Sequence, residues 1–359
     1  MTIDELLNTA QSNNKLLDVI IGDGIDPMKE IHDACKASYA DVDHRNPNRI
    51  YELDSESWKK YEHVRHYTTN VRPSPSYDFV LHLARKGILR SVITTNYDTT
   101  LDSMFNIFKN DISLPVNLNP ILGHNEWSHF GYCSEFALST AIDFWKIHGS
   151  LSHVFCRGCS TLLKCPDFVI PFGSKSVTDR YNHPITHMYL PGKASCCPIM
   201  LSPTEITGST CGHYIHPNDW NIPTFRSIPP FNQIIEKAMT RLRNETFGII
   251  FIGFKGNINY EEINQVAEDL FGTGVHWIMY LSSSQQASVE AGPEHFHLRD
   301  LIMNDGGIFE YSSTADIAGK LNEALLGSGL LSLTELIDYN NRFDDRYSSK
   351  EHWERILTT

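Results

Sequence analysis

Three short polar segments, each following an apolar run, carry the side chains best suited to chemistry in this sequence. They are Gly22-Asp23-Gly24, Thr94-Thr95-Asn96-Tyr97-Asp98 and His148-Gly149-Ser150. A glycine turn lets backbone N–H groups approach a phosphate closely because no Cβ intervenes. An asparagine can orient a sugar hydroxyl or an attacking water, and a histidine can act as a general base. The three segments therefore suit a ligand that contains a pyrophosphate and a ribose.

Each segment also has a purely structural explanation. Many tight turns contain Gly-x-Gly, and polar residues after a strand can simply begin the next helix, with Asp98 or Thr99 as its N-cap. A lone histidine such as His148 is usually structural. Placement favours function, because ligands of parallel α/β sheets bind beyond the carboxyl ends of the strands. Two further positions share this placement, Gly253-Phe254 and Ser282-Ser283.

The elements that must position these residues follow from the pattern of apolar runs and amphipathic segments. Their alternation predicts an α/β fold, a Rossmann-like doubly wound parallel sheet with helices on both faces. The predicted strands are Leu16–Ile21, Ser91–Thr95, Phe144–Ile147, Gly248–Phe254, Val275–Leu281 and Gly307–Tyr311. The first predicted helix begins at Asp26-Pro27. The other predicted helices are Tyr77–Arg85, Thr99–Phe108, Phe231–Arg243, Tyr260–Phe271 and Thr314–Leu326. Residues Leu114–Tyr132 resemble a loop.

Most of the eight cysteines lie between Cys156 and Cys211. The spacing Cys156-Arg157-Gly158-Cys159 suits two thiolates on one tetrahedral Zn²⁺. Cys211, followed by Gly212-His213, is the favoured third ligand, with Cys196 or Cys197 as its partner and Cys165 also available. A set of buried free thiols is the alternative. The predicted structural zinc site consists of Cys156, Cys159, Cys197 and Cys211.

Composition narrows the class of protein. The formal net charge of -13 disfavours general binding to a nucleic-acid backbone, which needs surplus Lys and Arg. The most apolar stretch, Phe247–Phe254, is far too short to cross a bilayer. Because the first residues lack the basic and apolar runs of a secretory signal, we expect a cytoplasmic protein with reduced thiols and no membrane segment.

Taken in chain order, these motifs resemble the sirtuin superfamily. That family has a Gly-Ala-Gly turn, a Thr-Gln-Asn-Ile-Asp strand end, a His-Gly motif, a zinc knuckle and a later glycine-containing strand end. The resemblance covers about Leu16 to Leu326 and is most specific at Ile147-His148-Gly149-Ser150 with Cys156 and Cys159. Thr-Thr-Asn-Tyr-Asp, together with the absence of a Pro-Asp-Phe-Arg element, is closer to the bacterial sirtuin-like branch, which includes antiphage NAD hydrolases, than to protein deacylases.

This resemblance implies an enzyme that hydrolyses NAD to nicotinamide and ADP-ribose. Asn96 would orient a ribose hydroxyl or the water, and Asp98 would hold the loop or the nicotinamide amide. His148 would accept the proton. The implied NAD contacts are Gly22, Asp23, Gly24, Thr95, Asn96, Asp98, Gly253, Phe254, Ser282 and Ser283, the two serines at the adenosine ribose. A protein-lysine deacylase and a non-catalytic NAD or ADP-ribose binding subunit are the alternatives.

The sequence departs from the family in the phosphate turn. Asp23 stands where the family has alanine, and Asp26 where it usually has serine. The electrostatic repulsion between a carboxylate and a phosphate charge about 4 Å apart would cost roughly 4 kcal/mol at an effective dielectric constant near 20. Either Asp23 points away from the pyrophosphate, or a conformational change or partner reshapes the turn, or this chain no longer turns over NAD.

The predicted organisation is a sirtuin-like NAD-binding domain interrupted by a small module. Residues 1–155 and 212–330 form the NAD-binding domain, residues 156–211 the cysteine-rich module, and residues 331–359 a C-terminal helix or tail. The expected partners are NAD and either further copies of the chain, in a homo-oligomer, or a protein of the same defence system.

Overall fold

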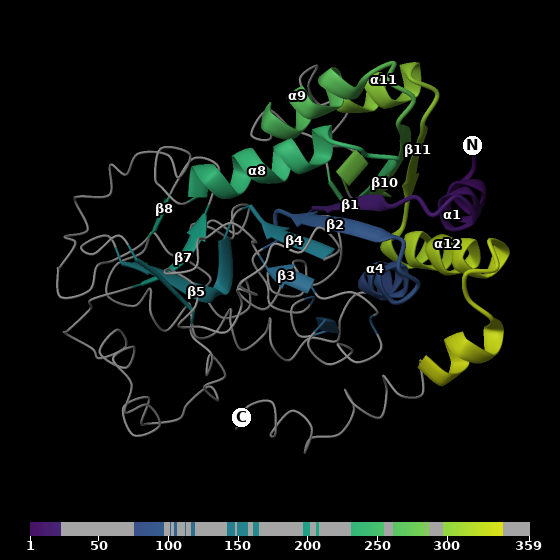
Figure 1. Cartoon of the computed structure of the whole chain (residues 1–359), viewed down its shortest axis with the longest axis horizontal. Coiled ribbons are helices and arrows are strands. Elements are labelled where there is room, and N and C mark those ends of the chain that lie inside the picture. Colours follow the sequence, from purple (N-terminus) through teal and green to yellow (C-terminus); the bar gives the residue numbers. More distant parts are fainter. Residues whose placement is uncertain are drawn as a thin grey trace.

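The structure is a computed structural model (Figure 1) that describes the following parts of the chain. They are residues 1–22, 75–96, 101, 104–105, 112, 116–118, 142–147, 149–156, 161–164, 197–201, 206–207, 231–254, 261–283, 285–286 and 297–339. For residues 75, 117–118, 149–156, 161–164, 197–201, 206–207, 231–234 and 261, the description covers the backbone.

A parallel sheet of seven strands forms the centre of the described fold. Its strand order is β11-β10-β9-β1-β2-β4-β3, and every neighbouring pair is parallel. The order reverses direction at β1, so the chain winds outward to both sides, as the doubly wound prediction requires. The strands are β1 (Leu17–Ile21), β2 (Leu89–Thr94), β3 (Val116–Leu118), β4 (Ile142–Lys146), β9 (Gly248–Ile252), β10 (His276–Ser282) and β11 (Ile308–Ser312).

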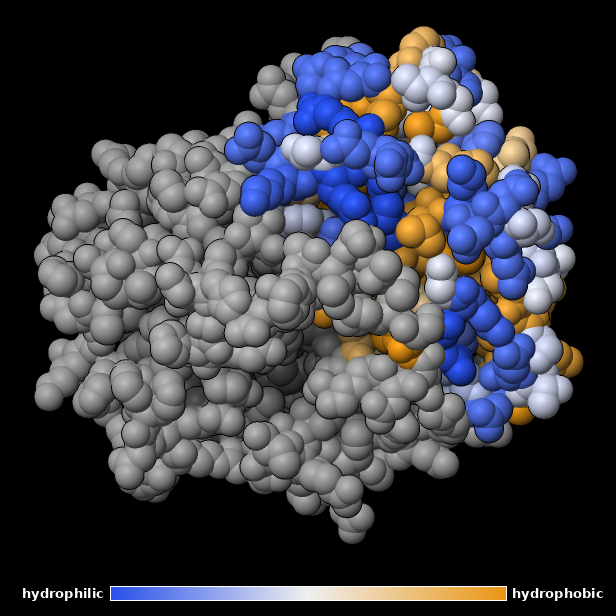
Figure 2. Space-filling view, viewed as in Figure 1, coloured by the Kyte–Doolittle hydropathy of each residue, from blue (hydrophilic) through white to orange (hydrophobic). Residues whose placement is uncertain are grey.

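Helices cover both faces of this sheet (Figure 1). Val19 and Ile21 belong to one buried cluster and Ile20 to the other, because successive side chains of a strand point to opposite faces. Figure 2 shows hydrophilic side chains gathered over α8 and α9, as expected for helices with one solvent face. One layer contains α1 (Ile3–Ser12), α4 (Pro75–Arg85) and α12 (Thr314–Gly327), and the other α8 (Phe231–Arg243), α9 (Glu261–Leu270) and α11 (His297–Asn304).

The predicted α/β class is therefore confirmed, and several details are corrected. Helix α1 was not predicted, although a capping box marks its start: the Glu5 N–H donates to Thr2 Oγ1 and the Thr2 N–H to the Glu5 carboxylate. Helix α11 was also missed. Strand β3 lies inside a stretch predicted as loop, because three residues are too few for a periodic signal. No helix in the described part is both long and apolar enough to cross a membrane.

A second, antiparallel sheet begins where β4 ends. Its order is β6-β5-β7-β8. It overlaps the predicted cysteine-rich module, but its first strand begins at Gly149, directly after His148. The domain boundaries in the sequence remain a prediction. The strands are β5 (Gly149–Cys156), β6 (Thr161–Lys164), β7 (Cys197–Leu201) and β8 (Ile206–Thr207).

The C-terminal part of the described chain packs against α4. Residues 333–339 are helical, and the Tyr339 hydroxyl donates to Asp78 Oδ1 at 2.7 Å. The Tyr339 ring lies 4.5 Å from the ring of His82, centroid to centroid. Burial, followed by the charges of Arg85 and Lys86, lowers the pKa of His82 to about 3. This histidine is therefore neutral in the folded chain at any pH above about 4.

The low pKa of His82 should make the chain less stable in mild acid. Below the ordinary pKa of 6.5 the unfolded chain binds a proton at His82 that the folded chain does not bind. Stability should therefore fall as the pH drops from about 6.5 toward 3, by up to about 1.4 kcal/mol per unit. Urea unfolding of wild type and of His82→Gln at pH 7 and pH 5 measures this contribution.

We expect the loss of stability between pH 7 and pH 5 to be about 1–2 kcal/mol smaller in the variant than in wild type. Glu335 does not interfere, because its ordinary pKa of 4.5 and the value of about 2 to which the hydrogen bond from Lys86 lowers it both lie below this window. Equal losses in the two proteins would show that His82 is not held neutral by the fold.

Candidate functional site

The described residues of the predicted site follow the carboxyl ends of four neighbouring strands. Gly22 follows β1, and Thr95 and Asn96 follow β2. Gly253 follows β9 and Ser282 ends β10. These strands are adjacent in the order β10-β9-β1-β2, so the residues share one edge of the sheet. This is the edge at which parallel α/β sheets bind ligands.

Gly22 lies so close to Gly253 that position 22 has no room for a side chain. The Gly22 N–H donates to the Ile252 carbonyl at 3.0 Å. A Cβ at position 22 would lie 2.4 Å from the Gly253 carbonyl oxygen and 2.6 Å from the Phe254 Cα. Gly253 has φ 66°, a left-handed conformation that favours glycine. Gly22 is thus required by its contact with the end of β9, a structural reason that the sequence did not reveal.

Alanine at position 22 should therefore destabilise the chain. The added methyl group meets backbone atoms that cannot turn aside, so strands β1 and β9 must separate locally. We expect a loss of about 1–3 kcal/mol in the free energy of unfolding, measured with urea.

Gly319→Ala is the matched control for this change. Gly319 lies inside α12, and a Cβ there would meet nothing within 4 Å. Alanine at that position should stabilise the chain by about 0.5–1 kcal/mol, because glycine is a poor helix former. If both variants shift stability in the same direction, the close contact of Gly22 with β9 is wrong.

Asn96 is buried at the end of β2, with only 2% of its surface exposed. Its side-chain nitrogen donates to the Gly22 carbonyl at 3.0 Å and to the Tyr77 hydroxyl at 3.2 Å. Its backbone N–H donates to Thr94 Oγ1 at 3.0 Å. The side-chain oxygen, Oδ1, is buried and has no hydrogen-bond partner in the described part of the chain. A buried acceptor of this kind usually binds water or a ligand.

The end of β2 is tied to both neighbouring strands. The Thr95 N–H donates to the Ile21 carbonyl at 3.1 Å, on the β1 side. On the β4 side, the Ile147 N–H donates to the Thr94 carbonyl at 3.1 Å. Ile147 directly precedes His148, the predicted general base, which lies outside the described residues. These bonds tie the backbone directly before Asn96 to the chain at the ends of β1 and β4.

Gln285, which was not predicted as a site residue, forms hydrogen bonds at the carboxyl ends of β9 and β10. Its side-chain oxygen accepts from the Ser282 N–H at 3.0 Å, and its nitrogen donates to the Gly253 carbonyl at 3.0 Å. This one side chain therefore links the ends of β9 and β10. Ser282 is buried and Ser283 exposed, whereas the Phe254 ring packs into the core beside Phe251.

Several predicted site residues lie outside the described residues, namely Asp23, Gly24, Asp98, His148, Cys159 and Cys211. Of the predicted zinc ligands, Cys156 ends β5 and Cys197 begins β7. These two strands pair, with Phe155 opposite Cys197. The backbone thus brings two of the four cysteines to neighbouring strands. Among the described side chains, no group of three or more His, Cys, Asp or Glu could hold a metal ion.

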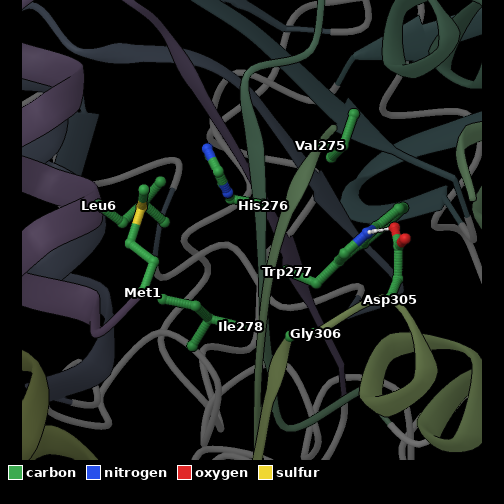
Figure 3. Close-up of a pocket in the computed structure, with 9 residues that line it drawn as sticks. Met1, Leu6, Val275, His276, Trp277, Ile278, Asp305 and Gly306 are labelled. Carbon is green, nitrogen blue, oxygen red and sulfur yellow. Dashed lines mark hydrogen bonds between the residues drawn. The ribbon is translucent and has the colours of Figure 1, made fainter. Parts of the chain in front are cut away.

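A pocket of about 170 Å³ lies at the opposite edge of the sheet (Figure 3). It is lined by His276 at the start of β10 and by Gly306 and Gly307 before β11. The Trp277 indole N–H donates to Asp305 Oδ2 at 2.7 Å beside it. Because this pocket borders the amino ends of the strands, it is not the predicted NAD site.

Comparisons with known proteins found similarity only among solved structures. No family model matches the chain, and no curated protein matches it. A complex of a Sir2 homologue with NAD is 13% identical, covers 91% of this chain and 96% of its own, and has a TM-score of 0.46. A mutant Sir2 homologue in complex with ADP-ribose is 14% identical, covers 90% of this chain and 96% of its own, and has a TM-score of 0.48. Sir2Tm bound to a propionylated peptide is 13% identical, covers 92% of this chain and 100% of its own, and has a TM-score of 0.47. With TM-scores below 0.5, the functional proposal rests instead on the motifs and on the contacts of Asn96.

Proposed function

We propose that this chain is a sirtuin-like enzyme that hydrolyses NAD to nicotinamide and ADP-ribose. The observation that supports it most is the unpaired Oδ1 of the buried Asn96, at the carboxyl edge of a parallel sheet. Leaving a buried acceptor unpaired costs about 1–3 kcal/mol, which a ribose hydroxyl or a bound water would offset. The order of the motifs in the sequence, from the glycine turn to His148, favours NAD as the molecule that supplies it.

In the proposed reaction, a water oxygen bonds to C1′ of the nicotinamide ribose as the bond from C1′ to the nicotinamide nitrogen breaks. The electron pair of that bond leaves with nicotinamide, which departs neutral. Asn96 holds a ribose hydroxyl or the water, and His148 accepts the proton that the water loses. Asp98 holds the loop or the nicotinamide amide. Because the leaving group is already good, the protein contributes mainly position and exclusion of bulk water.

The rest of the NAD molecule would lie along the same edge of the sheet. Its pyrophosphate would lie at the turn Gly22-Asp23-Gly24, next to the end of β9 at Gly253. Its adenosine ribose would lie at Ser282 and Ser283, at the end of β10. The edge from β2 through β1 and β9 to β10 comprises four adjacent strands, about 14 Å from first to last at the usual spacing of neighbouring strands.

The decisive experiment is incubation of the purified chain with NAD, with nicotinamide and ADP-ribose quantified by chromatography. Nicotinamide release without any peptide, lost in His148→Ala, supports the hydrolase. NAD that stays intact alone but is consumed when an acyl-lysine peptide is added makes the chain a deacylase instead. Binding of ADP-ribose without turnover in either condition makes it a non-catalytic subunit.

A structural zinc ion completes the proposal. Cys156, Cys159, Cys197 and Cys211 would hold it, and the pairing of Phe155 with Cys197 supports this by placing Cys156 and Cys197 on neighbouring strands. Four thiolates saturate a tetrahedral zinc, so the ion would stabilise the module and take no part in the reaction.

Metal analysis of the purified chain should therefore find about one zinc per chain. Cys156→Ser should lose that zinc and unfold at a lower temperature, whereas Cys35→Ser, outside the module, should keep it. A chelator should lower the melting temperature of wild type and leave that of Cys156→Ser unchanged. Zinc-free wild type with the same melting temperature would mean that the cysteines are free thiols.

The resemblance to bacterial sirtuin-like hydrolases further favours a role in antiphage defence in the cytoplasm. Such a role requires that NAD hydrolysis be switched on by infection, through a homo-oligomer or a partner protein of the same defence system. Light scattering of the purified chain with and without NAD tests whether it forms a homo-oligomer. Phage challenge of cells carrying wild type or His148→Ala tests the defence role itself.

A further inference from the structure

We infer that Tyr77 is a positioning residue that fixes the Asn96 amide so that its Oδ1 receives a hydrogen-bond donor of the ligand. The inference rests on the proposed function for the identity of that ligand. It adds a residue that lies in none of the sequence motifs, and it restricts the chemical group that can occupy this part of the site.

The orientation of the Asn96 amide follows from its neighbours. The Gly22 carbonyl oxygen can only accept a hydrogen bond, so the amide nitrogen and not the amide oxygen must face it, at 3.0 Å. The second hydrogen of that nitrogen is directed to the Tyr77 hydroxyl, at 3.2 Å. Both N–H groups are then used. The oxygen is left turned away from these two partners, buried and unpaired in the described part of the chain.

Tyr77 is well placed to hold this arrangement. It lies in the first turns of α4 with only 1% of its surface exposed, and it belongs to the core cluster between α4 and the sheet. The next residue, Asp78, accepts a hydrogen bond from the Tyr339 hydroxyl. Helix α4 is therefore anchored through two successive residues, and its tyrosine hydroxyl has little freedom to move away from Asn96.

An amide oxygen with this orientation selects the class of group that it binds. It can accept but not donate, so it suits a hydroxyl or a water and repels a phosphate oxygen. The phosphates of the ligand must therefore lie elsewhere on the edge, and a sugar hydroxyl or the attacking water lies at Asn96. Without Tyr77, one amide N–H would be buried without a partner, and the amide could rotate away from the productive orientation.

A double-mutant cycle on the full chain tests this, with ADP-ribose as the probe and calorimetry as the measurement. Tyr77→Phe removes only the hydroxyl. We expect it to raise the Kd for ADP-ribose about tenfold, equivalent to one ordinary buried hydrogen bond. Tyr339→Phe is the matched control, since it removes a buried hydroxyl bonded to the same helix. It should leave the Kd unchanged, and the fitted number of sites reports the folded fraction of each variant.

Introducing Tyr77→Phe into the Asn96→Ala variant separates an effect of Tyr77 on the Asn96 amide from a general structural effect. If Tyr77 acts through Asn96, adding Tyr77→Phe to Asn96→Ala should change the Kd by less than about twofold. If Tyr77→Phe raises the Kd for ADP-ribose by the same factor in wild type and in Asn96→Ala, or does not change the Kd in wild type, the inference is overturned. Wild type that binds ADP-ribose with the expected coupling but does not hydrolyse NAD overturns the proposed function alone. Wild type that binds no ADP-ribose overturns the inference, and it overturns the proposed function as well only if nicotinamide release is also absent.

Discussion

Replacing Asn96 with alanine should lower the rate of NAD hydrolysis by about 10²–10³-fold, the usual effect of removing one preorganised polar group from the reacting centre. The amide oxygen is a buried acceptor at the carboxyl edge, and it has no hydrogen-bond partner in the described structure. Its loss removes the group that orients the ribose hydroxyl or the water. Nicotinamide release by wild type and variant, at saturating NAD, measures the effect.

Asn304→Ala is the control for this prediction, because that asparagine is exposed at the end of α11, near the opposite edge of the sheet. It should hydrolyse NAD at the wild-type rate. Asn96→Ala should remain folded but lose about 1–3 kcal/mol of stability, because it removes the hydrogen bonds of the amide nitrogen to the Gly22 carbonyl and the Tyr77 hydroxyl. Wild-type turnover by a folded Asn96→Ala variant would remove this residue from the reaction.

The central strands could be predicted from the sequence because both faces of the sheet are covered. Strands β1 and β9 are buried at every position, so their sequences are short, almost continuous apolar runs bounded by turns. The predicted end of β9 was two residues too late, since Gly253 already turns away in a left-handed conformation. The helix predicted after Asn96 is helical at its described residues, Leu101, Met104 and Phe105.

The rest of the fold lacked such a signal. Strand β3 has three residues and gains its stability from pairing with β4, which no local pattern encodes. Helix α1 could have been found from Thr2 and Glu5, whose spacing is that of a capping box. Helix α11 has eight residues, only two of them fully buried, so its periodicity is short.

The candidate site was predictable only where its residues follow strands. Asn96 and Gly22 were placed at the carboxyl edge because each directly follows or closely follows an apolar run. Tyr77 was not, because an aromatic residue on an amphipathic helix is normally core, and its role depends on a contact 19 residues away. Gln285 reaches the backbone of Gly253, 32 residues away. Such contacts are set by the packing of elements and leave no pattern in either segment.

A buried ion pair at the amino edge of the sheet was also not anticipated. Asp18 is fully buried within β1, and Arg90, in β2, is 4% exposed. Arg90 Nε donates to Asp18 Oδ1 at 2.9 Å, and its terminal nitrogens reach Asp18 Oδ2, the Asn244 carbonyl and Thr246. The Ser91 hydroxyl also donates to Asp18. The network joins β1, β2 and the segment before β9, far from the candidate site.

Removing Arg90 from this network should destabilise the chain more than any other change considered for the sheet. Arg90→Ala leaves the Asp18 carboxylate buried with only hydroxyl partners, and breaking a buried pair in this way costs about 3–5 kcal/mol. Urea unfolding measures the loss.

Arg243→Ala is the matched control, because the bond of Arg243 to Asp269 is equally well formed at 2.7 Å but exposed on both sides. Exposed pairs contribute only about 0–1 kcal/mol, so this variant should unfold almost as wild type. The double change Asp18→Leu with Arg90→Met should recover much of the loss, because the cost lies in the unpaired charge and not in the absence of the pair. If the double variant is no more stable than Arg90→Ala, the pair itself holds the strands together, and its hydrogen bonds to Ser91, Asn244 and Thr246 must contribute more than the charge does.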